Sequence, residues 1–158
     1  MTGGVLVRRL TPLDRGEIQT AAEWLSHEWG LSLGYSPAET LDLCQSVAGA
    51  SDQCILIASQ NGRMIGTVMV IDNDLETDTI LTPWLSALYV APPHRGRGNG
   101  HRLVEAALNF AEQAGASSLY LYVIKGRLVQ YYSDLGWRAV DEFTRGGTDF
   151  IVMEKTTI

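Results

Sequence analysis

A glycine- and arginine-rich segment, residues 95–101, is the part of the sequence best suited to chemistry. It reads Arg-Gly-Arg-Gly-Asn-Gly-His and joins a β-rich run to a segment with helical periodicity. Glycines let successive main-chain N–H groups converge on one point without side chains in the way. The start of a helix adds unpaired N–H donors and the positive end of the helix dipole. Because Arg95, Arg97 and Arg102 add positive charge, the segment predicts a phosphate-binding loop.

The spacing of these glycines excludes two common phosphate loops. A P-loop requires a lysine directly after its last glycine, and no lysine follows here. A dinucleotide-binding fingerprint requires a third glycine, but that position holds another residue whichever glycine the count begins from. The pattern that does fit is Arg-x-x-Gly-x-Gly, formed by Arg95, Gly98 and Gly100.

Length and composition describe an acidic globular domain. The 158 residues are 46% hydrophobic and 19% charged, so the chain can bury a core without a metal or a disulfide. A net charge of −6 disfavours nucleic acid as a partner and favours cationic small molecules. No signal peptide or membrane span is apparent, which predicts one cytoplasmic domain over residues 1–158. Cys44 and Cys54 have no metal-ligand spacing and are expected to be buried as small apolar residues.

Alternating strand and helix patterns predict the elements that position the loop. Thr11 and Pro12 predict the start of a helix that fades near Gly30, and Ser36 with Glu39 predicts the capping box of a second helix. The Asn-Gly pair at 61–62 predicts a hairpin turn. We expect strands at 5–10, 53–59, 64–71, 84–90, 118–123, 137–143 and 150–154, and further helices from the loop to about 114 and at 127–135. This order indicates a mixed α/β domain.

Strand, loop and helix together resemble the GNAT superfamily of N-acetyltransferases. The acetyl-CoA pyrophosphate loop of that family follows [R/Q]-x-x-G-x-[G/A], which residues 95–100 match. Residues 88–92 match the L-Y-V-x-P strand end that precedes it, and residues 132–137 match a later Tyr-x-x-x-Gly-[Phe/Trp] signature. The resemblance implies an α/β (α+β) fold with a mixed, mostly antiparallel central sheet, a splayed strand pair and flanking helices.

The resemblance also implies acetyl-CoA as co-substrate. Backbone groups of Leu88 and Val90 would bind the pantetheine arm in the gap beside their strand, with Tyr89 on the other face. The pyrophosphate would be held, mainly by main-chain N–H groups, along Arg95, Gly96, Arg97, Gly98, Asn99, Gly100 and His101. The alternative for the two loop arginines is solvated surface charge. Many members carry an asparagine where this sequence has Lys125, which changes that contact or brings a lysine toward a phosphate.

Tyr132 matches the tyrosine that family members often use to protonate the departing CoA thiolate. A phenol of pKa about 10 facing a thiol of about 8.5 is a poor donor by roughly 2 kcal/mol. Its first effect is therefore expected to be a hydrogen bond to the developing thiolate. The alternative is a core aromatic beside Leu128 and Leu135. The other tyrosines nearby are predicted to pack: Tyr120, Tyr122 and Tyr131.

The sequence alone does not identify the residue that acts as general base. The strand at 84–90 contains no acid, and the nearest candidates follow the preceding strand: Asp72, Asp74, Glu76 and Asp78. Each alone is interpreted as a solvated turn residue, and together they would attract an amine. His27 and His101 are expected at the surface and at the loop. Four aromatics either form a wall of the acceptor site or pack between elements: Trp24, Trp29, Tyr35 and Trp84.

Two functions follow from the resemblance. The first is an acetyl-CoA-dependent N-acetyltransferase that acts on a primary amine by direct attack on the thioester. Its acceptor is a small molecule, a peptide N-terminus or a lysine, and the acidity favours a polyamine-like or aminoglycoside-like cation. The second is a catalytically silent acyl-CoA-binding module, which Lys125 and the missing strand acid keep open. Transfer of a longer acyl group also stays open, and homodimers are common in the family.

Overall fold

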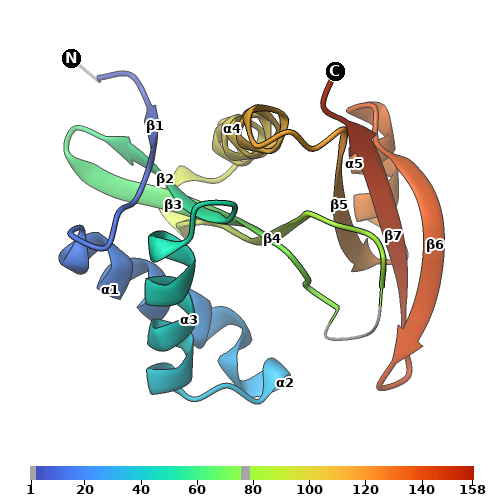
Figure 1. Cartoon of the computed structure of the whole chain (residues 1–158), viewed down its shortest axis with the longest axis horizontal. Coiled ribbons are helices and arrows are strands. Elements are labelled where there is room, and N and C mark those ends of the chain that lie inside the picture. Colours follow the sequence, from blue (N-terminus) through green and yellow to red (C-terminus); the bar gives the residue numbers. More distant parts are fainter. Residues whose placement is uncertain (1–2, 76–78) are drawn as a thin grey trace.

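The computed structural model describes residues 3–75 and 79–158, and over these residues seven strands form one sheet (Figure 1). The strands are β1 (Leu6–Arg9), β2 (Cys54–Gln60), β3 (Arg63–Ile71), β4 (Trp84–Val90), β5 (Ser118–Ile124), β6 (Arg138–Arg145) and β7 (Thr148–Thr156). Their order across the sheet is β1-β2-β3-β4-β5-β7-β6, and neighbours run antiparallel except for β4 and β5. The predicted mixed, mostly antiparallel sheet is confirmed.

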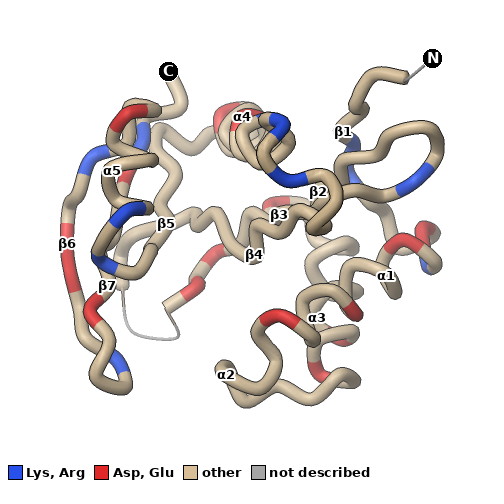
Figure 2. The backbone as a smooth tube through the Cα atoms, turned by 180° about the vertical axis from the view of Figure 1, so that it is seen from behind, with Lys and Arg blue, Asp and Glu red and all other residues tan. Residues whose placement is uncertain are grey.

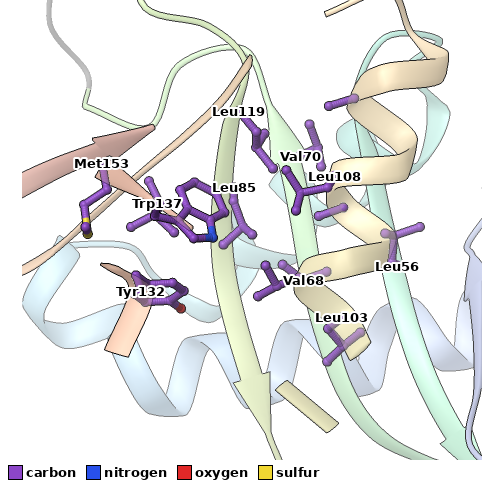
Figure 3. Packing of buried hydrophobic residues seen from close by; sticks show 14 of the residues in the cluster. Leu56, Val68, Val70, Leu85, Leu103, Leu108, Leu119, Tyr132, Trp137 and Met153 are labelled. Carbon is purple, nitrogen blue, oxygen red and sulfur yellow. The ribbon is translucent and has the colours of Figure 1, made fainter. Parts of the chain in front are cut away.

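Helices cover both faces of this sheet. α1 (Arg15–Leu25) and α3 (Pro37–Gly49) pack on one face, and α4 (Asn99–Gln113) packs on the other (Figure 1). α5 (Arg127–Asp134) contacts β5 and β6. Because successive residues of a strand face opposite ways, β2 and β3 must be apolar on both faces. Figure 3 shows the α4 half of the core, with Leu103 and Leu108 of the helix facing Leu56, Val68 and Val70 of the sheet.

The first helix begins later than the sequence predicted. Thr11 and Pro12 belong to a turn, and α1 starts at Arg15 after an N-cap at Asp14. The Asp14 carboxylate accepts the Thr11 N–H at 2.8 Å and the Arg8 guanidinium at 3.2 Å. These contacts, between residues three and six positions apart, hold the turn in place of a first helical turn, so the prediction of a Thr11 cap was wrong.

This helical region also continues past Gly30, where it was predicted to fade. A π-helical segment (Ser26–Gly30) and the short α2 (Leu31–Leu33) follow α1 without a break. The path ends at Gly34, whose φ of 75° is the left-handed conformation that favours glycine. A side chain at Gly30 would lie 3.2 Å from the Tyr35 carbonyl oxygen, so the glycine permits close packing and does not end the helix.

Several local predictions are confirmed. Ser36 and Glu39 form both hydrogen bonds of the capping box at the start of α3. Asn61 and Gly62 have φ values of 53° and 78°, as a type I′ turn between β2 and β3 requires. Cys44 and Cys54 are free and buried, as expected. The capping box and the turn were predictable because each depends on residues close together in the chain.

Candidate active site

β4 and β5 diverge and leave the sheet open at its centre. Among the described residues their parallel pairing consists of Trp84 opposite Tyr120, and the Tyr120 N–H donates to the Pro83 carbonyl oxygen at 3.0 Å. Trp84 is fully buried and anchors this point, with its Nε1–H donating to the Leu81 carbonyl oxygen at 2.7 Å. Beyond the anchor the strands are not paired, so the predicted splayed strand pair is confirmed.

A cleft of about 730 Å³ fills the gap between these two strands. Its lining includes four consecutive residues of each strand: Leu85, Ser86, Ala87 and Leu88 of β4, and Leu121, Tyr122, Val123 and Ile124 of β5. Because successive residues point to opposite faces, a cleft lined by consecutive residues passes through the sheet. It joins the α4 face to the face covered by α1 and α3. Two molecules entering from opposite faces can therefore meet inside it.

β4 is bent where it borders the cleft. Its register with β3 shifts between Thr67 and Met69, so that Ala87 and Leu88 stand opposite the single residue Val68. Ala87 has a φ of 55°, which is uncommon for a residue with a side chain. Such a bulge leaves its extra residue out of the hydrogen-bond ladder and bends the strand. The two residues of the bulge, Ala87 and Leu88, both line the cleft.

The predicted phosphate loop lies where β4 leads into α4. Gly96 and Gly98 have φ values of 74° and 79°, and apart from the glycine and its two chain neighbours no described atom lies within 4 Å of where a side chain at either would begin. The Arg102 N–H donates to the Gly98 carbonyl oxygen at 3.1 Å. In a helix that starts here, the N–H groups of Asn99, Gly100 and His101 have no helical acceptor. The loop is thus open and presents main-chain donors at the positive end of α4.

Two side chains of the loop hold its shape. Asn99 is buried, and its Nδ2 donates to the His94 carbonyl oxygen at 2.9 Å. Arg95 Nε donates to the Val90 carbonyl oxygen at 2.7 Å, and its guanidinium lies over the Tyr89 ring at 5.5 Å from the ring centre. These contacts brace the end of β4, so the loop's main chain is better placed than these side chains to bind an anion.

The other polar side chains at this end of α4 face solvent. Arg97 and Arg102 are exposed, and Figure 2 shows basic positions where the chain enters α4. His101 lies 3.9 Å from Glu105 and is half exposed. Lys125 is exposed directly after β5 and is not among the described residues that line the cleft. Arg97 and Arg102 therefore add exposed positive charge beside the main-chain donors of the loop.

Tyr132 of α5 is both a core residue and a cleft residue. It is 6% exposed, packs edge-to-face against Trp137 at 5.8 Å between ring centres, and lines the cleft. Figure 3 shows its hydroxyl turned toward β4. Burial, with a smaller contribution from Tyr131, raises the pKa of Tyr132 to about 12. The phenol therefore stays protonated at neutral pH and acts as a hydrogen-bond donor.

Asp74 is the acidic residue that the structure brings to the cleft. Its Oδ1 accepts a hydrogen bond from Ser86 Oγ of β4 at 2.8 Å, and both residues line the cleft. Asp72 is exposed and lies outside the described lining, and burial together with Asp52 raises its pKa. Glu76 and Asp78 lie outside the described residues. An acid thus reaches β4 from the preceding segment, although the strand itself contains none.

A smaller pocket of about 150 Å³ adjoins the cleft on the α1 and α3 face. Of the four predicted aromatics, Trp29 and Tyr35 line it. Trp24 instead packs on Tyr89 at 5.3 Å between ring centres, and Trp84 is buried in the core. The π-helical segment carries Trp29, and π-helical turns are frequent at functional sites. The residues shared by the pocket and the cleft are Trp29, Leu33, Asp74, Ser86, Ala87, Tyr122 and Arg145.

The sequence matches the family model described as the acetyltransferase (GNAT) family over residues 18–137. The chain belongs to the GNAT family. The matched segment contains β4, β5, the loop at the start of α4 and Tyr132. A search of the curated proteins found no match to this GNAT chain.

Solved structures at low identity share the GNAT fold. An aminoglycoside 6'-N-acetyltransferase complexed with coenzyme A is 16% identical, with a TM-score of 0.78 and coverage of 97% of both chains. A GNAT-family acetyltransferase from Streptococcus pneumoniae is 22% identical, with a TM-score of 0.69 and coverage of 97% of this chain and 99% of the other. The Salmonella typhimurium protein yncA, solved with its cofactor acetyl-CoA, is 17% identical, with a TM-score of 0.74 and coverage of 98% and 95%. These likenesses establish the fold.

Two residues of this GNAT site were not predicted from the sequence. Tyr122 packs as predicted, against Trp84, Phe143 and Phe150, and it also lines both the cleft and the adjoining pocket, which the sequence did not indicate. Arg145, which ends β6, lines both as well and lies over the rings of Tyr122 and Phe143, at 5.8 and 5.2 Å from their centres. Arg145 reaches the cleft because β6 pairs with β7 and β7 with β5. A basic residue before a Gly-Gly turn gives no local signal of this placement.

Other groups contribute nothing to the described site. His27 is exposed and outside the described lining of both cavities. Among the residues at 3–75 and 79–158, no group of three or more His, Cys, Asp or Glu side chains could hold a metal ion. None of the described helices is long and apolar enough to cross a membrane.

Proposed function

We propose that this protein is an acetyl-CoA-dependent N-acetyltransferase that acts on a primary amine of a small molecule. The observation that carries the proposal is the cleft through the sheet, which connects the face of α4 and Tyr132 with the face of Asp74. Acetyl-CoA would enter from the first face and the amine from the second. The nitrogen would then attack the thioester carbon directly, with no acetylated protein group in between.

The proposed acetyl-CoA site follows β4 into the loop. Main-chain groups of Leu88 and Val90 would pair with the amides of the pantetheine arm as an added strand would. The N–H groups between Gly96 and His101 would bind the pyrophosphate, with Arg97 and Arg102 adding charge. Support comes from membership in the GNAT family and from the structural neighbours solved with coenzyme A or acetyl-CoA.

Tyr132 would act on the leaving sulfur. When the amine nitrogen forms its bond to the carbonyl carbon, the carbon–sulfur bond breaks and its electron pair leaves with the sulfur. The protonated phenol would donate a hydrogen bond to that developing thiolate. The pKa of about 12 makes outright proton transfer from the phenol costly, so stabilisation of charge is its main proposed role.

Asp74 would act on the amine. An alkylammonium of pKa about 10.4 must lose a proton before it can attack, which costs about 4.6 kcal/mol at pH 7. A carboxylate beside the bulge of β4 can bind the ammonium and receive its proton directly or through one water. The hydrogen bond from Ser86 Oγ to Asp74 Oδ1 orients the carboxylate group, which also sets the direction of its second oxygen.

The test has two steps. First, calorimetric titration with acetyl-CoA, CoA and ATP should show binding of the two CoA species and none of ATP. Second, thiol release should depend on an added amine, with the acetylated amine identified by mass spectrometry. Binding without thiol release across a broad amine panel would support the silent acyl-CoA-binding module instead. Absence of acetyl-CoA binding would refute both functions.

A further inference from the structure

The acceptor side of the site carries one charge of each sign. Among the described residues that line the cleft and the adjoining pocket, Asp74 and Arg145 are the charged ones, and each lines both cavities. The lining is thus neutral as a whole, whereas the protein carries −6. Figure 2 shows acidic positions between β3 and β4 and a basic one at the β6–β7 hairpin. A polyamine or aminoglycoside would place several ammonium groups near a single carboxylate and a guanidinium that repels them.

Apart from these charges, the adjoining pocket is mostly apolar. Its walls include the side chains of Leu25, Leu33, Leu43, Met69 and Ile71, together with Trp29 and Tyr122. Its volume is about 150 Å³, and an apolar cavity of roughly that size holds a group as large as benzene. The uncharged polar residues of the lining are fewer: Tyr35, Thr40, Asn73 and Ser86. A polyhydroxylated sugar would lose hydrogen bonds to water against the apolar part of the wall. The pocket therefore suits one compact apolar group.

Arg145 is positioned to receive an anion. Its guanidinium rests on the rings of Tyr122 and Phe143, and Nη2 donates to the Leu75 carbonyl oxygen at 3.3 Å. A guanidinium has five N–H donors, and its planar edge matches the two oxygens of a carboxylate. The aromatic rings limit the directions that this long side chain can take. Arg145 is exposed, so a carboxylate at the mouth of the cleft would meet a guanidinium whose position these contacts favour.

We infer that the acceptor is a compact zwitterion whose amine and carboxylate lie close together and whose side chain is apolar, as in a free apolar α-amino acid. Asp74 would bind the ammonium, Arg145 the carboxylate, and the adjoining pocket the side chain. This inference rests on the proposed N-acetyltransferase function and names its substrate class. It departs from the polyamine-like or aminoglycoside-like acceptor that net charge alone favours.

An acceptor panel tests each part of this inference. At saturating acetyl-CoA, thiol release is compared for L-phenylalanine and L-leucine, their amides, 2-phenylethylamine, glycine, spermidine and an aminoglycoside. The amides keep the amine and side chain but lack the carboxylate, and glycine keeps both charges but lacks the side chain. We expect kcat/KM for the apolar amino acids to exceed that for their amides roughly 10- to 100-fold, the range of a charge-assisted hydrogen bond. Spermidine or the aminoglycoside as the best acceptor would overturn the inference.

The variant Arg145→Gln identifies the residue responsible. It should lower kcat/KM for L-phenylalanine roughly 10- to 100-fold, mainly through KM, and leave the amide within about twofold. If the role of Arg145 were merely structural, the variant would lower kcat/KM equally for both substrates, and that result would refute the inference. Arg63→Gln is the matched control, because Arg63 is exposed at the start of β3 and outside the described lining. It should change neither substrate.

A binding measurement separates the failure of this inference from the failure of the proposed function. L-phenylalanine and its amide are titrated into the CoA-loaded protein, and into CoA-loaded Arg145→Gln. If the parent binds the amino acid more tightly than the amide and the variant does not, the zwitterion site is supported even when no acetylated product forms. The missing product would then count against the proposed transferase function. If other amines are acetylated but the amino acid is not bound preferentially, the transferase function is supported and the inference of a zwitterionic acceptor is refuted.

Discussion

Replacing Tyr132 with phenylalanine removes the one atom by which this residue would act on the sulfur. The ring is 6% exposed and packs against Trp137 and Tyr131, and phenylalanine preserves that packing. The hydroxyl is turned toward β4 (Figure 3), and residues of β4 and Tyr132 itself line the cleft. The substitution therefore tests the chemistry of the hydroxyl with little change in the core.

The expected loss of kcat follows from the pKa of Tyr132, which burial raises to about 12. Full proton transfer to a thiolate of pKa about 8.5 would be uphill by about 5 kcal/mol, so the phenol is expected to stabilise charge by hydrogen bonding. A hydrogen bond to a charged group contributes about 1.5–3 kcal/mol. At 1.36 kcal/mol for each factor of ten, loss of the hydroxyl should lower kcat roughly 10- to 150-fold. The KM for acetyl-CoA should change much less.

Steady-state kinetics with the best acceptor of the panel measure this effect. Tyr131→Phe is the matched control, because Tyr131 is 46% exposed, adjoins Tyr132 and is not among the described lining residues. It should keep kcat within about twofold. In the parent, a phenol of pKa about 12 stays protonated, so kcat should show no loss from its ionisation up to about pH 10.

Two results would refute this reasoning. An unchanged kcat in Tyr132→Phe would assign the residue to the core alone. A fall in kcat near pH 10 that is present in the parent and absent in Tyr132→Phe would mean that the phenol ionises far below the pKa its burial imposes. In either case the leaving thiolate would have to be stabilised by another group of the cleft.

Three further predictions concern the loop, the acid and the thiols. Gly98→Asp and Gly98→Asn both place a residue that tolerates left-handed backbone at a φ of 79°, so the difference between them isolates the effect of charge. Two like charges at ~4 Å repel by about 1 kcal/mol or more. Calorimetry should therefore show that the aspartate variant binds acetyl-CoA at least about fivefold more weakly than the asparagine variant. Asp74→Asn should lower kcat/KM for amines roughly 10-fold or more, whereas Asp72→Asn should not; equal losses would refute the role of Asp74. Burial raises the pKa of Cys44 to about 11 and of Cys54 to about 12, so a thiol reagent at pH 8 should label them only on unfolding.

The same buried thiols give stability a defined pH dependence. Their folded-state pKa values lie above the unfolded value of 9.0. Above that pH the unfolded chain loses thiol protons that the folded chain retains, so the free energy of unfolding falls as pH rises toward about 11 and 12. Below pH 9.0 the full contribution is present. Chemical denaturation across this range measures the slope, and a flat profile would contradict it.

The sequence by itself determined the features that depend on neighbouring residues. The Asn61-Gly62 turn and the Ser36–Glu39 capping box form as predicted because backbone conformation and short-range hydrogen bonds decide them. The loop at 95–101 was found for the same reason, since the left-handed glycines and the helix start are local. The prediction of a Thr11 cap failed because Asp14 holds residues 11–14 in a turn, by accepting from the Thr11 N–H and from Arg8, and the helix starts after it. Motif order then placed the chain in the right family.

Only the tertiary structure decided which side chains share the site. Asp74 differs from Asp72 in sequence by two positions, yet only Asp74 meets Ser86 of β4. Arg145 reaches the cleft through two strand pairings, of β6 with β7 and of β7 with β5. The pKa of Tyr132 is raised mainly by burial between elements, with a smaller contribution from its sequence neighbour Tyr131. Charge, burial and distance are properties of the packed sheet, so residue spacing alone could not reveal them.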